Sequence, residues 1–120
     1  MTQEIEKKDL EVLISNCLRN LGILSYLKGY NYLIEAIILT VSSPSLTQTT
    51  KVIYKNIADK FNSNSSAIEK CIRTAIHNGW PHSNPETIKQ LFGNSVASGK
   101  TPTNACFIKT IVSFFFHIIG

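Results

Sequence analysis

Two short apolar stripes at helical spacing, one on either side of a polar run, constrain the fold of this chain most strongly. The first stripe comprises Ile57, Ala58 and Phe61, and the second comprises Ile68, Ile72, Ala75 and Ile76. Only Asn and Ser occupy positions 62–66 between them. Asn62 tolerates the left-handed backbone of a tight turn, and any residue of 63–66 can cap a following helix. The pattern predicts two helices joined by a tight turn, a helix-turn-helix over about 55–76.

The remainder of the chain also has helical periodicity. A first helix is expected to end at Gly22, and a nearly all-apolar helix over 30–41 is expected to lie in the middle of a bundle. Asn84 and Pro85 form a helix-start signature, and residues 101–104 cap a final helix. Alternating strand patterns are too short to predict a sheet. We therefore expect an all-α fold of about six helices in a single compact domain, over residues 10–120, after a polar N-terminal extension over 1–9.

The composition indicates a single hydrophobic core and a reducing cellular compartment. The 120 residues are 43% hydrophobic and 17% charged, which suits a single domain, and the net charge of +4 favours an anionic partner. Three cysteines, an odd number, argue against a disulfide framework and for a reducing, cytoplasmic location. The N-terminus lacks the features of a signal peptide. The most apolar stretch, 107–119, falls short of the roughly 20 residues that span a bilayer, so we expect no membrane partner.

The second helix of the pair presents a polar, basic outer face. At about 100° per residue, the face opposite the apolar stripe collects Ser66, Lys70, Arg73, Thr74 and His77, with Ala67 and Glu69 on its flanks. In a major groove, Arg and Lys can donate to guanine, Glu can accept from cytosine, and Thr offers a hydroxyl and a methyl. Phosphate contacts are expected from Lys51, Lys55, Lys60, Ser65 and Ser66. Spacing and charge alone leave open DNA binding or a protein-interaction module.

Residues for enzyme chemistry do not cluster in the sequence. The three histidines and Cys71 have no recognised metal-ligand spacing, and no glycine-rich phosphate loop is present. Glu35 has no neighbouring carboxylate in the sequence, so a buried, hydrogen-bonded acid is a better interpretation than a catalytic one. Trp80 is expected to anchor the core. The sequence therefore predicts no enzyme activity, no cofactor and no metal.

Several stretches, in order, resemble a known family: KGYNYLIEAI (28–37), TKVIYKNIADKFN (50–62), SSAIEKCIRTAI (65–76), LFG (91–93) and PTNACFI (102–108). They are similar to the C-terminal DNA-binding effector domain of the stage-zero sporulation response regulator. The resemblance covers about residues 10–112. It implies a six-helix, sequence-specific DNA-binding domain whose helix over 65–76 lies in the major groove, with molecules in tandem on DNA and contact with the sigma subunit of RNA polymerase.

The resemblance also implies site residues. Glu69 and Arg73 match the family's recognition-helix pattern, while Lys70 stands where the family has Arg. Ala67 replaces an Arg of the family pattern, and the outward-facing Thr74 replaces a His. A shifted or weaker target preference is therefore expected. Base contacts are assigned to Glu69, Lys70, Arg73 and Thr74.

The resemblance contains no counterpart of the family's N-terminal receiver domain. The chain is therefore interpreted as an isolated domain or as a stand-alone paralogue. The rival function is a degenerate paralogue that pairs with a full-length regulator or with RNA polymerase. The surface expected for that pairing comprises Phe114, Phe115 and Phe116.

Overall fold

All regular elements of the computed structural model, which describes residues 7–44, 49–93 and 100–119, are helices. In chain order they are α1 (Lys7–Asn20), α2 (Lys28–Ser42), α3 (Thr50–Lys60), α4 (Ser65–Gly79), the 3-10 helix η1 (Trp80–His82), α5 (Pro85–Phe92) and α6 (Asn104–Ile119). The expectation of an all-α fold of about six helices is confirmed. Helix α1 begins at Lys7, inside the range 1–9 expected to precede the domain. Residues 1–6 lie outside the described residues.

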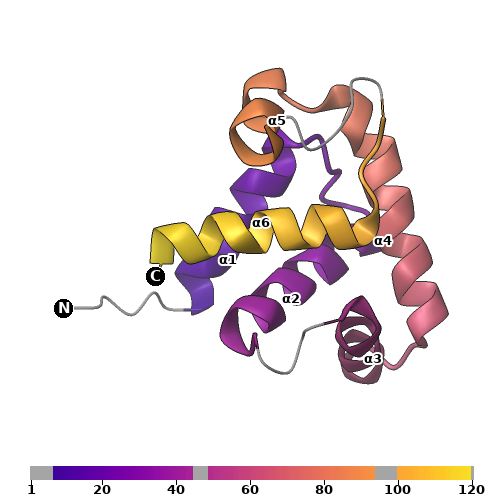
Figure 1. Ribbon diagram of the computed structural model, residues 1–120. Coiled ribbons are helices and arrows are strands. Elements are labelled where there is room, and N and C mark those ends of the chain that lie inside the picture. The colour runs from indigo at the N-terminus through magenta and orange to yellow at the C-terminus, as the bar shows by residue number, and fades with distance from the viewer. Residues whose placement is uncertain (1–6, 45–48, 94–99, 120) are drawn as a thin grey trace.

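Helix α2 is the centre of the fold, and α1, α3, α4 and α6 all pack against it (Figure 1). Its sequence explains this position, because a helix with apolar residues nearly all round must be covered on several sides. Leu33, Ala36 and Ile37 have no exposed surface. Helix α6 runs across the front of the molecule in Figure 1, from its start beside α4 towards the end of α1 that carries the N-terminus.

Turn residues end the helices largely where the sequence indicates. Gly22, after α1, has a φ of 82°, and Asn62, between α3 and α4, has a φ of 53°, so both adopt left-handed backbone. Gly22 also lies directly against Gly79 at the end of α4. A Cβ atom added to Gly22 would lie 2.2 Å from the carbonyl oxygen of Gly79, so this contact requires glycine.

Three aromatic rings pack together where η1, α5 and α6 meet. The ring of Trp80 meets that of Phe92 edge-on, with centroids 5.1 Å apart, and that of Phe107 at 6.4 Å. These contacts join η1, α5 and α6 and confirm Trp80 as a core anchor. The side chain of Asn84 caps α5 by accepting from the N–H of Glu86 at 2.8 Å, which confirms the predicted helix start.

Two expectations about phenylalanines are wrong. Phe61 was expected to face inward, but it is 40% exposed. It follows the last residue of α3, so the helical spacing no longer sets its direction, and its ring lies edge-on to Tyr32 at the surface. Phe115 is 2% exposed and belongs to the core, so it cannot form a partner surface together with Phe114 and Phe116.

Candidate nucleic-acid interface

Helix α4 is divided into a buried apolar face and an exposed polar face. Ile68, Ile72, Ala75 and Ile76 have no exposed surface, whereas Ser66, Lys70, Arg73, Thr74 and His77 are exposed. Asn64 caps the helix, because its side chain accepts from the N–H of Ala67 at 2.9 Å. The helix runs three residues beyond the predicted end at Ile76, to Gly79. The outer face is therefore an uninterrupted polar strip on a well-anchored helix.

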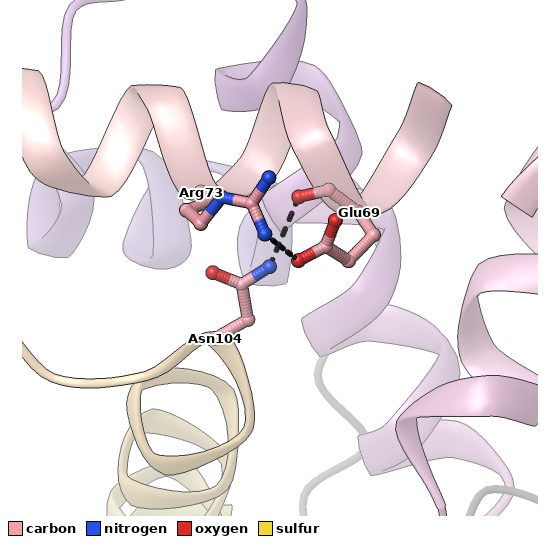
Figure 2. Close-up of polar contacts among 3 residues, drawn as sticks. All are labelled: Glu69, Arg73 and Asn104. Carbon is pink, nitrogen blue, oxygen red and sulfur yellow. Dashed lines mark hydrogen bonds and ion pairs between the residues drawn. The ribbon is translucent and has the colours of Figure 1, made fainter. Parts of the chain in front are cut away.

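Within this strip, Arg73 is held by Glu69 one turn earlier. The guanidinium Nη1 of Arg73 lies 2.5 Å from Oε1 of Glu69, in the favourable i, i+4 order (Figure 2). The side chains are 52% and 36% exposed, so the pair contributes little to stability. Its consequence is positional, because it restricts the rotamers of Arg73 while leaving the guanidinium accessible.

Asn104, the first residue of α6, lies beside Glu69 and Arg73 and forms a polar cluster with them. Its side-chain amide donates to the main-chain carbonyl of Glu69 at 3.0 Å, and Figure 2 shows it beside the ion pair. Sequence reasoning assigned residues 101–104 only to capping α6. Thr103 does accept from the N–H of Cys106 at 3.1 Å, which confirms the cap. The second role of Asn104 was missed, because its partner lies 35 residues away and no local spacing indicates it.

A hollow of about 400 Å³ lies along the edge of α4 that carries Glu69 and Arg73. Its lining comes from α3 (Thr50, Tyr54), α4 (Glu69, Arg73, His77) and the residues leading into α6 (Thr101, Pro102, Thr103, Asn104, Ala105). Burial raises the pKa of Tyr54, against the opposing effect of its hydrogen bond with Asn104, so its phenol stays protonated at neutral pH. The hydroxyl, amide and guanidinium groups of the hollow can hydrogen-bond phosphate or base edges, whereas the Glu69 carboxylate can only accept from a base.

The predicted phosphate contacts are not all equally placed. Lys51 and Lys55 are exposed on α3, and Ser65 and Ser66 are exposed in the first turn of α4. Lys60 differs, because its ammonium forms an ion pair of 2.8 Å with Glu35 of α2. That pair gives Glu35 the polar partner that was expected, but its side chain is 22% exposed and is not buried as predicted. Lys60 lies about 180° around α3 from Lys51.

Two further observations concern the whole described chain. Residues 7–44, 49–93 and 100–119 contain no cluster of three or more His, Cys, Asp or Glu side chains that could hold a metal ion. Among the helices in this part of the chain, none combines the length and apolarity that crossing a membrane requires.

Comparison of the chain with known protein families identifies the family to which it belongs. Residues 14–114 match the family described as Sporulation initiation factor Spo0A C terminal. The chain belongs to this family. The match includes all of α2 to α5, the cluster of Glu69, Arg73 and Asn104, the second half of α1 and most of α6.

Membership in the Spo0A C-terminal family confirms the resemblance found in the sequence. The family is a DNA-binding transcription activator domain and is not enzymatic, so DNA is a partner of this chain and the expectation of no enzyme activity is confirmed. The match concerns the family as a whole.

Proposed function

We propose that this chain is a sequence-specific regulator of the sporulation-initiation type that reads the major groove with α4. The α3–α4 pair, predicted over about 55–76, would act as its helix-turn-helix, within an effector domain over residues 10–120. The observation that carries the proposal is the exposed polar strip of α4 beside its wholly buried apolar face. An α-helix fits the major groove of B-DNA, so a strip of donors and acceptors on such a helix can meet base edges.

Four residues are proposed to contact bases: Glu69, Lys70, Arg73 and Thr74. Arg73 is the strongest candidate, because its ion pair with Glu69 holds an exposed guanidinium ready for bidentate donation to guanine. Lys70 offers a single ammonium group where an Arg would offer a planar guanidinium that can donate two hydrogen bonds. Thr74 has a shorter side chain than the His of the family pattern. A target sequence that differs from the family's usual one is therefore expected at the positions that these two residues face.

Phosphate contacts are proposed for Lys51 and Lys55 on α3 and for Ser65 and Ser66 at the start of α4. All four are exposed. Lys60 was assigned to the same group from the sequence and stays a prediction, which its ion pair with Glu35 makes less favourable. The regulator would work in the cytoplasm, in tandem on DNA and in contact with the sigma subunit of RNA polymerase, as the resemblance implies.

Selection of bound sequences from a random duplex pool at moderate salt tests the proposal. A clear motif supports it, whereas binding without a motif leaves only electrostatic attraction. Arg73→Ala should then lose about 1 to 3 kcal/mol of discrimination at one base pair. Lys55→Ala should weaken all sequences alike and reduce the salt slope by about 0.9. If both variants bind duplexes as the parent does, α4 does not read DNA.

The rival function, a protein-interaction module, retains one supporting observation. Apolar side chains are exposed on α1 and α6, with Val12 at 55%, Leu13 at 41% and Phe116 at 39%. Such residues could meet a full-length regulator or the polymerase. Size-exclusion chromatography with light scattering, with and without the purified partner, tests this function. A strict monomer that binds neither partner contradicts it.

A further inference from the structure

We propose that Lys28, which lies outside the α3–α4 pair, contacts a DNA phosphate. Lys51 and Lys55 would contact one wall of the major groove, and Lys28 would contact the opposite wall. This inference rests on the proposed function, because it requires α4 to lie in the groove. It adds a binding residue and a third helix, α2, to the interface.

The two edges of α4 face different neighbours. Arg73 and His77 line the hollow shared with α3 and the start of α6. Lys70 and Thr74, on the other edge, line a second hollow of about 270 Å³. Its remaining lining comprises Leu27, Lys28, Gly29 and Cys71. The polar strip therefore has α3 along one edge and the first turn of α2 along the other.

The first turn of α2 is fixed in this position by a backbone contact. A Cβ atom added to Gly29 would lie 2.2 Å from the carbonyl oxygen of Cys71 and 2.7 Å from the Cβ of Ala75. Only a glycine allows two helices to approach this closely. Lys28 is adjacent to Gly29 in the chain and is exposed. Its attachment point is thus held at the rim of the polar strip.

The charges around Lys28 favour an anion. The first turn of α2 contains no acidic residue, and the residues that line the second hollow include no Asp or Glu. Lys28 and Lys70 share this hollow, so two positive charges come together with no acid among its lining residues. Glu35, further along α2, is engaged by Lys60. A phosphate beside the Lys28 ammonium would offset this positive charge and leave Lys70 to face the bases.

The dimensions of the groove make a second wall accessible. A major groove about 12 Å wide holds a helix about 10–12 Å in diameter, so phosphates of both strands border the helix. The α3–α4 pair reaches one wall through Lys51 and Lys55. A side chain at the other edge of α4 can reach phosphates of the opposite strand. Lys28 lies at that edge, on α2, a helix outside the α3–α4 pair. A DNA phosphate is therefore the occupant that the position fits.

The test compares the salt dependence of DNA binding for Lys28→Ala with that of the parent, using the duplex recovered by selection. Fluorescence anisotropy titrations between 50 and 200 mM KCl give the slope of log K against log salt. Loss of one phosphate contact should reduce the slope by about 0.9 and the affinity by about 8-fold at 0.1 M salt. Lys28→Arg should bind like the parent. Lys89→Ala is the matched control, because Lys89 is exposed on α5, away from α4.

Four outcomes separate this inference from the proposed function. A reduced slope with an unchanged preferred motif supports a phosphate contact by Lys28. Parental affinity and slope for Lys28→Ala, while Lys55→Ala loses one unit of slope, overturns this inference and leaves the proposed function standing. A changed motif for Lys28→Ala also overturns it, because Lys28 would then read a base. Parental binding by Lys55→Ala and Arg73→Ala together overturns the proposed function itself.

Discussion

The side-chain amide of Asn104 donates a hydrogen bond of 3.0 Å to the main-chain carbonyl of Glu69, and so ties the start of α6 to the polar strip of α4 (Figure 2). Asn104 is only 9% exposed. Water therefore competes poorly for this bond, which adds a polar link to the packing of α6 against α4. Glu69 in turn holds Arg73, so a buried tertiary contact supports the residue proposed to read DNA.

Replacement of Asn104 by Ala should lower the free energy of unfolding by about 1–2 kcal/mol, since a shielded hydrogen bond and some packing are lost. Urea denaturation followed by circular dichroism measures the change. Asn16→Ala is the matched control, because Asn16 is exposed on α1, and it should not be destabilising. An unchanged urea midpoint for Asn104→Ala would mean that the bond does not contribute to stability.

Gly29→Ala should destabilise the domain by about 1–3 kcal/mol or more, because the added Cβ would overlap the carbonyl oxygen of Cys71 and the backbone must shift. Thermal unfolding followed by circular dichroism measures it. Gly29 lies in the first turn of α2, a helix in which Ala would otherwise be preferred, so a more stable variant would show that α2 and α4 do not approach this closely.

Lys60→Ala should change the salt slope of DNA binding by far less than Lys55→Ala, which should reduce it by about 0.9. The reason is that Lys60 is paired with Glu35 in the groove between α2 and α3, away from Lys51 and Lys55. Anisotropy titrations over a range of salt concentrations compare the two variants. Equal losses of slope would restore Lys60 to the set of phosphate contacts.

Stability should fall as the pH rises from about 9 towards 11, in part because of Cys17. Burial raises the pKa of Cys17 to about 11. An unfolded chain releases this proton first, near its ordinary pKa, so the stability that is present below pH 9 is lost as pH rises through the folded value.

The Cys17 contribution can be isolated by substitution. Denaturation of the parent and of Cys17→Ala at several pH values should show a constant difference below pH 8 that shrinks between pH 9 and 11. A difference that stays constant up to pH 11 would show that the Cys17 thiol does not titrate differently in the two states.

The sequence alone determined the helices and most of their inward faces. Apolar spacing placed Ile68, Ile72 and Ala75 on the buried side of α4, and Gly22 and Asn62 marked turns that require left-handed backbone. These features are local: a helix repeats every 3.6 residues, and a turn residue acts through its own φ and ψ. The outward direction of Lys70, Arg73 and Thr74 followed from the same periodicity.

Only the tertiary structure decided which residues border the polar strip. Asn104 beside Glu69, Lys28 beside Lys70, and Glu35 in contact with Lys60 are pairs brought together by the chain path. No residue spacing encodes such pairs, because helix packing depends on side-chain volumes and close backbone contacts summed over the whole core. The sequence therefore determined the face that α4 presents, and the packing of α2, α3 and α6 around α4 determined what surrounds that face.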